Sequence, residues 1–479
     1  MSTAPLVHRH RTAMVRHTLS QPMSLAVRHR LVREGTTVFD YGCGQGGDLR
    51  ALSSAGVEAR GWDPHFAPDE QIFEAEIVNL GFVLNVIENT AERQAALERA
   101  WSISRKALVV SVMLVGAVPL DGLRPFGDGF LTSRGTFQKY YQHAEIRAVV
   151  AQAVGAEPVA LAPGIFVAFR APEDEQEFLL ERRRGRRAST SSYATGRSRK
   201  AVLARPELHE RIEAALTATA EFALHRGRLP HAEEMPATVH DLLASERVSF
   251  ARAVDTCVAL TLDRDAFEQA RRDSREDLLV HYALGALNRT KSAARPSPSM
   301  VRDIRTHFGS QQQLAEQALE YLHALAEPQH TVAAMRECAE RGLGILDEDQ
   351  RLIIDGGRIE RLSGPLRCYT GCASYLAGDV EDGDLVRLDP LRKRLTIFRL
   401  ADRKSPFPAI TSSVAVDLRR QDVILRAEDR TLIRKSHVFG LPPRSKQRKL
   451  EAEMADRHGL GPDKVVVRSL MVLPPSASG

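Results

Sequence analysis

The chain has 479 residues, of which 43% are hydrophobic and 27% are charged. This length exceeds what one compact core usually holds, so we expect two or three domains of a soluble globular protein. The net charge is only +5, and no apolar run approaches the roughly 18 residues of a membrane span, which argues against a membrane-embedded chain.

The first 33 residues are predicted to form a basic N-terminal arm. They contain six arginines, four histidines and no acidic residue, and no apolar stretch follows as it would in a secretory signal. The five cysteines are scattered, and the closest pair, Cys368 and Cys372, lacks the further ligands of a zinc or iron–sulfur site. We therefore expect a cytoplasmic protein without a metal centre.

Residues 34–181 alternate apolar strands with helices. Strands are predicted over 36–40, 57–62, 76–84, 107–114 and 164–170, and helices over 47–56, 90–103 and 144–154. An ordered insertion is expected over 121–141. This alternation predicts a Rossmann-like α/β domain with a parallel, doubly wound sheet. Because only some 12 residues separate Asp63 from Glu76, the sheet should lack one strand, and the contacts of an adenine ring stay unassigned.

The remaining chain divides into three regions. Residues 182–200 contain eight basic residues and no acid, as in a flexible linker or a segment that contacts a polyanion. Residues 201–343 have helical periodicity, and residues 344–479 alternate as strands of a C-terminal α/β region.

The turn after the first strand reads VFDYGCGQGGDLRAL, from Val38 to Leu52. Its glycines fit the G-x-G-x-x-G fingerprint of dinucleotide-binding proteins. Asp40, Gly42, Gly44 and Gly46 fit equally well the acidic-x-G-x-G-x-G turn of methyltransferases that use S-adenosylmethionine (SAM). The glycines alone do not separate these two cofactors.

Asp40 favours SAM. A carboxylate two residues before the first glycine is unwelcome beside a pyrophosphate, but it suits a cofactor whose methionine end carries an ammonium and a sulfonium. Asp63, at the end of the second strand, would bind the ribose hydroxyls. Asn79 and Gly81, at the end of the third strand, would border the methyl donor.

Several segments together resemble a known family, the methyltransferases associated with DNA phosphorothioation gene clusters. The resemblance is carried by RTAMVRHTLSQPMSLAV, FDYGCG, GWDPH, VNLGFVLNVIEN, FGDG with LTSRGTFQKYY, and the distant GPLRCYTGCA. It spans most of the chain and is strongest before Glu181. The resemblance implies a class I methyltransferase fold and a link to bacterial DNA modification and restriction.

The acceptor side is predicted from two segments. Asn79-Leu80-Gly81-Phe82 keeps the amide and the aromatic of the D/N/S-P-P-Y/F turn of amino-methylating DNA enzymes, without its prolines. The second segment is FGDGFLTSRGTFQKYY, from Phe126 to Tyr141, whose aromatic and basic residues suit an extruded base or a single strand. Asn79, Phe82 and Tyr140 are the candidate catalytic residues. Methylation of cytosine C5 is not expected, because Cys43 lies inside the cofactor turn and the other cysteines lie beyond the first domain.

Basic residues are the candidate contacts to nucleic acid, and they fall in the insertion and in the linker: Arg134, Lys139, Arg182, Arg183, Arg184, Arg186 and Arg187. The sequence thus predicts a SAM-dependent methyltransferase that acts on nucleic acid, with DNA as the favoured substrate and with protein partners from a DNA modification system. Two alternatives stay open. The protein could be a catalytically silent subunit that binds SAM and DNA, or a methyltransferase of tRNA or of a small molecule.

Overall fold

The computed structural model describes residues 7–16, 18–118, 120, 122–190, 208–287 and 296–468, with the backbone alone for 184–190 and 208. The chain forms two compact units. One combines the residues up to Asp174 with those from Glu327 onward, and the other comprises Glu175–Ala326. Within the described residues, every helix is too short or too polar to cross a membrane.

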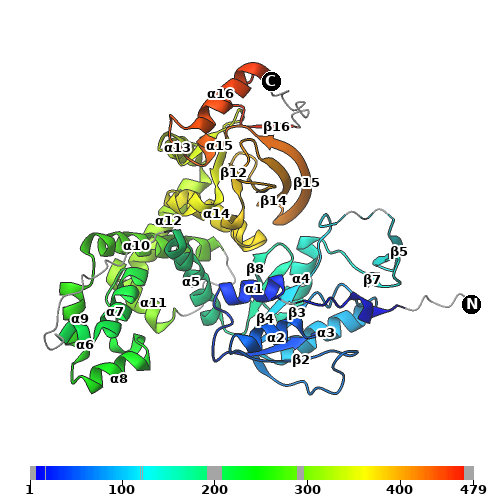
Figure 1. The fold of residues 1–479 in the computed structure, drawn as a ribbon, viewed down its shortest axis with the longest axis horizontal. Helices are drawn as coiled ribbons and strands as arrows, with labels where there is room; N and C mark the ends of the chain where they lie inside the picture. Colours follow the sequence, from blue (N-terminus) through cyan, green and yellow to red (C-terminus); the bar gives the residue numbers. More distant parts are fainter. Residues whose placement is uncertain are drawn as a thin grey trace, which may run out of the picture. The chain divides into compact units, whose positions relative to one another are not determined.

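The first unit contains a six-stranded sheet in the order β2-β1-β3-β4-β9-β8 (Figure 1). Its strands are β1 (Thr37–Tyr41), β2 (Glu58–Trp62), β3 (Ala75–Gly81), β4 (Ser104–Ser111), β8 (Val159–Ala162) and β9 (Ile165–Phe169). The helices along this part of the chain are α1 (Gln21–Arg28), α2 (Gly47–Ser54), α3 (Thr90–Ser102) and α4 (His143–Val154).

The sheet is mixed, whereas the sequence predicts a parallel one. Strands β1 to β4 pair in parallel, but β9 pairs antiparallel with β4 and with β8. The four residues of β8 were not predicted as a strand. A tight turn at Gly164 joins β8 to β9, so β9 has to run back along its neighbour instead of crossing over through a helix.

Apolar side chains explain why this sheet forms. Phe39, Val78, Leu108 and Val110 are completely buried in one cluster with Leu97 of α3. Strands that carry near-continuous apolar runs are buried on both faces, which is the usual situation in α/β sheets. Each such side chain contributes about 1.5–3 kcal/mol when it leaves water.

Strand β2 lies at the edge of the sheet. Residues 63–74, all of which the structure describes, contain no helix and no strand beyond the single bridge between Asp63 and Ala67. The short segment before β3 therefore adds no strand outside β2, as its length predicts.

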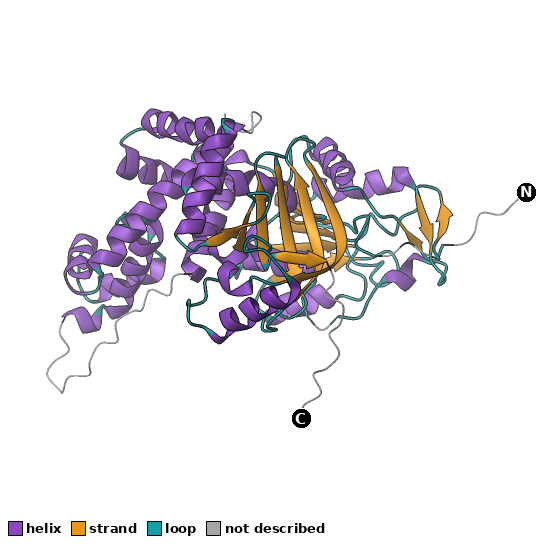
Figure 2. Ribbon diagram, turned by 90° about the horizontal axis from the view of Figure 1, so that it is seen from above, coloured by secondary structure: helices purple, strands orange, loops and turns teal. Residues whose placement is uncertain are grey.

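The insertion forms a small sheet of its own, with β5 (Arg124–Phe126), β6 (Gly129–Leu131) and β7 (Phe137–Gln138). Figure 2 shows this sheet apart from the larger ones. Phe137 is its buried anchor. A Cβ on Gly129 would lie 2.6 Å from the Phe137 ring, so only glycine fits there.

The C-terminal region adds a seven-stranded antiparallel sheet to the same unit. Its strands follow the chain in order: β10 (Gly344–Leu346), β11 (Leu352–Asp355), β12 (Leu385–Asp389), β13 (Arg394–Leu400), β14 (Ala409–Asp417), β15 (Asp422–Leu432) and β16 (Val466–Arg468). The accompanying helices are α13 (Pro328–Glu340), α14 (Gly364–Ala377), α15 (Lys435–Val438) and α16 (Lys446–His458). Leu425 of β15 packs against the core of the six-stranded sheet.

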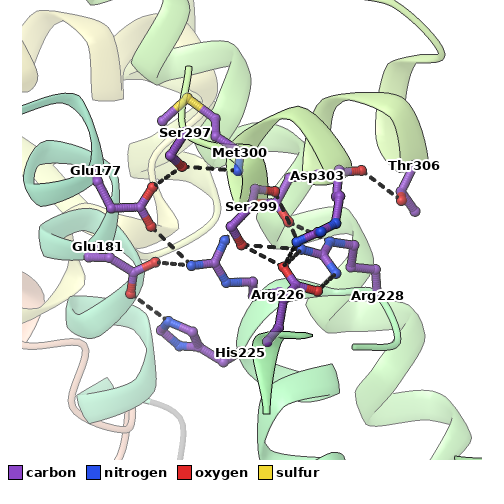
Figure 3. A network of polar contacts seen from close by, with 12 residues as sticks. Glu177, Glu181, His225, Arg226, Arg228, Ser297, Ser299, Met300, Asp303 and Thr306 are labelled. Carbon is purple, nitrogen blue, oxygen red and sulfur yellow. Dashed lines mark hydrogen bonds and ion pairs between the residues drawn. The ribbon is translucent and has the colours of Figure 1, made fainter. Parts of the chain in front are cut away.

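The described residues of the second unit form helices. The helical region that the sequence predicts over 201–343 extends beyond this unit, because α13 (Pro328–Glu340) belongs to the first unit. The second unit contains most of α5 (Pro172–Thr190), followed by α6 (Leu208–Arg211), α7 (Glu213–Arg226), α8 (Ala237–Ser245), α9 (Phe250–Leu260), α10 (Arg264–Leu287), α11 (Pro298–Phe308) and α12 (Gln311–Ala326). Asp303 of α11 accepts hydrogen bonds from Arg226 and Arg228, which tie α7 and the following turn to α11 (Figure 3).

The predicted linker differs from the structure at its start. Helix α5 continues through residue 181, where the sequence places a domain boundary, and includes residues 182–190. Arginine has a high helix propensity, so the basic composition does not break a helix that is already established. The rest of the predicted linker, residues 191–200, lies outside the described residues.

Candidate cofactor site

The glycine turn connects β1 to α2 at the carboxyl edge of the sheet. Gly42, Gly44 and Gly46 all have positive φ angles, of 88°, 52° and 70°. A Cβ on Gly42 would lie 2.4 Å from Cγ2 of Val83, so no larger residue fits there. Gly46 caps the N-terminus of α2 in the left-handed conformation. The sequence therefore needs glycine for the turn itself, and the turn exposes backbone to a ligand.

Asp40 and Asn79 form a buried pair below this turn. Nδ2 of Asn79 donates a 2.8 Å hydrogen bond to Oδ1 of Asp40, and both residues are at most 5% exposed. Burial raises the pKa of Asp40 to about 7, helped by the nearby charge of Asp48 and opposed by the Asn79 hydrogen bond. A cation would stabilise the ionised form of this carboxyl group.

The amide of Asn79 has one unsatisfied atom. Its Oδ1 is buried, and no donor among the described residues bonds to it. Gly81 makes room for this amide, because a Cβ there would lie 3.0 Å from Nδ2 of Asn79. A buried acceptor without a donor is costly, so this atom favours a ligand that brings a donor group.

Asp63 holds the turn from the neighbouring strand. Its Oδ2 accepts a 3.0 Å hydrogen bond from the backbone N–H of Gly44, and its Oδ1 accepts from the N–H groups of His65 and Phe66, each at 2.9 Å. The carboxylate predicted to bind ribose thus also organises the two loops between which a ribose would lie.

A pocket of about 700 Å³ opens between the glycine turn and the segment after β2. The turn contributes residues 43–46, the edge strand contributes residues 59–61, and the segment after it contributes Phe66, Ala67 and Glu70. The volume is within the usual range for small-molecule sites.

The N-terminal arm lies across this edge of the sheet, which the sequence did not indicate. Arg9 forms ion pairs with Glu88 and Glu92, at the start of α3, and they raise the pKa of the guanidinium. The backbone N–H of His8 donates to Gly135 of the insertion. The arm is thus fixed to two segments that flank the site.

Further along, the arm touches the glycine turn. Nε2 of Gln45 donates a 3.3 Å hydrogen bond to the carbonyl of Ala13, and the carbonyl of Arg16 would lie 3.3 Å from a Cβ on Gly47. The positive charge of Arg16 also lowers the pKa of Asp40, against the larger effect of burial. An acid and a cation at one turn suit a ligand with both an ammonium and a carboxylate.

Phe82 has a strained backbone directly after β3. Its φ angle is 60°, unusual for a residue with a side chain, and its N–H lies 3.2 Å from Oγ of Ser111 at the end of β4. Such strain persists where the surrounding structure imposes it, often at functional sites. Phe82 directly follows the strand that carries Asn79, and its role on the acceptor side stays a prediction.

The insertion meets this loop, but one of its predicted contacts is engaged internally. The backbone N–H of Lys139 donates to the carbonyl of Asn85, which brings Tyr140 to the segment that follows Phe82. Nζ of Lys139 lies 2.7 Å from both Asp128 and Glu145 and is largely buried. Lys139 therefore positions the insertion, whereas Arg134 is exposed.

The predicted linker arginines are not a continuous exposed row. Arg182 and Arg183 are 7% and 8% exposed within α5, and Nη1 of Arg183 lies 2.8 Å from Nδ1 of His281. The side chains of Arg184, Arg186 and Arg187 lie outside the described residues. The structure thus gives Arg182 and Arg183 a packing role that charge composition alone could not reveal.

No family model and no curated protein matches the chain. Among solved structures, the chain is similar to the sugar N-methyltransferase KedS8 from Streptoalloteichus, with 17% identity, 31% of this chain and 84% of that chain covered, and a TM-score of 0.25. It is also similar to magnesium protoporphyrin IX methyltransferase from Synechocystis with bound SAM, with 17% identity, 31% and 76% covered, and a TM-score of 0.22.

A third structure is CalS10, a SAM-bound amino pentose methyltransferase from Micromonospora echinaspora, with 17% identity, 32% and 90% covered, and a TM-score of 0.24. All three are methyltransferases, and two of them hold SAM. The first unit has a mixed α/β sheet with the glycine turn after its first strand. Because these TM-scores are below 0.5, the function has to be inferred from the site itself.

Proposed function

We propose that the protein is a SAM-dependent methyltransferase. The observation that carries the proposal is the buried Asp40–Asn79 pair at the glycine turn, with an acceptor atom of Asn79 that lacks a donor. SAM fits this donor and acceptor set, because its methionine end brings an ammonium, a sulfonium and a carboxylate. NAD does not fit it, because a pyrophosphate would lie near the Asp40 carboxyl group.

Different residues of the chain bind different parts of SAM. Asp40 and Asn79 accept from the ammonium, the exposed backbone of Gly44 and Gly46 borders the methionine end, and Asp63 accepts from the ribose hydroxyls. The pocket at Phe66 receives the rest of the nucleoside. Bound SAM supplies an electrophilic methyl group, which passes to a nucleophilic nitrogen or oxygen of the acceptor. Phe82 and Tyr140 lie on the side from which that acceptor approaches.

We propose that the acceptor of the methyl group is a nucleic acid, and that DNA is the favoured substrate. The support is the exposed cation Arg134 together with Phe82 and Tyr140, since aromatic and cationic side chains bind an extruded base or a single strand. The resemblance to the family associated with DNA phosphorothioation adds bacterial DNA modification as the setting.

The experiment is a methyl-transfer assay with SAM carrying a labelled methyl group. Genomic DNA with and without phosphorothioate, tRNA and a small-molecule extract are offered separately, to wild type and to Asp40→Asn. Label in DNA that Asp40→Asn abolishes supports the proposal. Label in tRNA or in small molecules alone contradicts the DNA assignment and leaves the methyltransferase assignment standing.

Calorimetric titration with SAM accompanies the assay. If the protein binds SAM and DNA but transfers no methyl group to any of the pools, it is a silent binding subunit, and the enzymatic proposal fails. If it binds NAD in place of SAM, the cofactor assignment fails as well.

A further inference from the structure

Two hairpin turns of the C-terminal sheet bring five cations together. The turn between β12 and β13 carries Arg392, Lys393 and Arg394, and the turn between β14 and β15 carries Arg419 and Arg420. We call these five residues the turn cluster. They occupy two short segments that are 25 positions apart in the sequence, so neither segment alone stands out as strongly basic.

The sheet register explains why the two turns meet. Alternate turns of an antiparallel meander lie at the same end, and Arg394 of β13 is paired with Asp417 of β14. The backbone N–H of Leu418 donates a 3.0 Å hydrogen bond to the carbonyl of Lys393, which joins the two turns directly. The cluster is therefore a fixed feature of the sheet and does not depend on side-chain flexibility.

The two acidic residues beside the cluster accept hydrogen bonds from the backbone of the turns. Oδ1 of Asp417 accepts 3.1 Å hydrogen bonds from the backbone N–H groups of Arg419 and Arg420, which lower the pKa of Asp417. Asp389 likewise accepts from the N–H of Arg392, at 3.1 Å. Both acids are largely buried.

The cations, in contrast, are mostly turned toward solvent. Arg392, Arg394, Arg419 and Arg420 are exposed, and Lys393 is half-buried. Arg394 pairs with Asp417 at 3.2 Å, and Arg392 lies 3.4 Å from Asp389. Within the part of the chain that the structure describes, no side chain forms an ion pair with Lys393, Arg419 or Arg420. These three carry positive charge that the fold itself does not use.

The second turn and the strand that follows it contact the first domain. Nη1 of Arg147, in the second turn of α4, lies 3.5 Å from Oε1 of Gln421. A Cβ on Gly116, in the loop after β4, would lie 2.8 Å from the carbonyl of Leu425, which is on the strand that follows the second turn.

We propose that the turn cluster binds the phosphate backbone of duplex DNA. The two hairpins are two strand spacings apart, about 10 Å. Duplex DNA carries several phosphate charges within such a distance, about one per 1.7 Å of helix axis. This surface deepens the proposed function by naming a docking site for its substrate, and it can be tested without methyl transfer.

The test is a salt titration of duplex DNA binding, followed by fluorescence anisotropy with the full-length protein. The variant changes Arg392, Lys393, Arg419 and Arg420 to Ser and leaves Arg394, which pairs with Asp417. Each phosphate contact contributes a slope of about 0.9 to the fall of log affinity with log salt. We expect the variant to lose about two to four units of slope and to bind at least about tenfold more weakly at low salt.

A matched control has the same change in net charge elsewhere. Arg252, Arg264, Arg271 and Arg272 are exposed cations of α9 and α10, and their replacement by Ser should leave the slope unchanged. An unchanged slope in the cluster variant, or equal losses in both variants, overturns the proposal. Wild type that binds anionic phosphatidylserine vesicles through the cluster but does not bind DNA also overturns it.

Thermal unfolding and SAM titration separate the remaining outcomes. Because Arg392, Lys393, Arg419 and Arg420 lie at turn tips, the cluster variant should keep the unfolding midpoint and the SAM affinity of wild type. Loss of DNA binding in a protein that never binds SAM supports the cluster and rejects the methyltransferase. Normal DNA binding by the cluster variant, with SAM binding intact, rejects the cluster alone.

Discussion

Asn79 and Asp40 are 39 positions apart in the chain, yet the amide of one donates to the carboxyl group of the other across 2.8 Å. Adjacent parallel strands place them there, because Asp40 of β1 is in register with Asn79 of β3. Strand pairing therefore fixes the position of a buried carboxyl group, and the ionisation of that group depends on what binds beside it.

The first prediction is a pH dependence of SAM affinity. Burial raises the pKa of Asp40 to about 7, so the ionised fraction grows as the pH rises toward 7. A cationic ligand binds the ionised form, and the apparent affinity scales with that fraction, so affinity should rise on the order of tenfold from pH 5.5 to 7.0. Calorimetry at both values checks this. Asp40→Asn should bind weakly, with no such dependence, and a flat wild-type profile would contradict the role of Asp40.

A second prediction concerns Asp63. Asp63→Ala removes the acceptor for three backbone N–H groups and for the ribose, so SAM affinity should fall by about 1.5–3 kcal/mol, the range for hydrogen bonds to a charged group. Asp69→Ala, an exposed acid in the same segment, is the control and should leave affinity unchanged. Equal affinity in the two variants would show that Asp63 only shapes the turn of the free protein.

Two glycines with similar backbone angles test the turn. Gly44 and Gly56 have φ angles of 52° and 76°, but a Cβ on Gly44 would lie 3.2 Å from Cβ of Ala13, whereas a Cβ on Gly56 would have no neighbour within 4 Å. Both alanine variants should lose about 1 kcal/mol of stability from the left-handed conformation. Only Gly44→Ala should also bind SAM at least tenfold more weakly. Similar SAM titrations of the two variants would remove Gly44 from the site.

The arm offers a prediction without any ligand. Glu88→Gln combined with Glu92→Gln removes both ion-pair partners of Arg9, so residues 8–16 should open more often and trypsin should cut after Arg11 and Arg16 more rapidly. Glu98→Gln, on the same helix but bonded to Gln94, is the matched control. Mass spectrometry of a digestion time course gives the rates. Identical rates in both variants would mean that the ion pairs do not hold the arm.

A fifth prediction concerns the stability of the helical unit. Asp303 has a fully buried side chain and bridges Arg226 at 2.9 Å and Arg228 at 2.6 Å (Figure 3). Asp303→Ala leaves two buried guanidinium groups without this partner and should cost about 3–5 kcal/mol in the unfolding of this unit. Glu233→Ala removes a largely exposed partner of Arg302 and should cost less than about 1 kcal/mol. Urea unfolding of both variants tests the contrast.

Local pattern was enough to predict much of the first domain. Near-continuous apolar runs predict β1, β3 and β4 to within a few residues, and spacing alone connects Asp40, the glycines and Asp63. The direction of β9 was harder to predict than its position. Its partner β8 is only four residues long, and an apolar run does not distinguish antiparallel from parallel pairing.

Long-range partners explain the remaining differences. Composition shows which residues are basic, but it does not show which partners the fold brings to them. These partners are Glu88 for Arg9, Asp128 for Lys139 and His281 for Arg183. Lys139 and Arg183, which the sequence predicts as contacts to nucleic acid, are therefore engaged within the protein. The turn cluster was missed for the opposite reason, since its two segments meet only through the register of β13 and β14.

The order in which the first unit is assembled has a consequence for biosynthesis. The unit is built from residues up to Asp174 and from Glu327 onward, so a ribosome makes the whole second unit, Glu175–Ala326, between its halves. Before the C-terminal region is synthesised, two contacts of the first domain are missing. Gly378 does not yet lie against Leu161, and Leu425 does not yet lie against Gly116. Contacts between such distant segments slow folding and leave apolar surface open to aggregation. The nascent chain should accordingly depend on a chaperone until β15 has emerged.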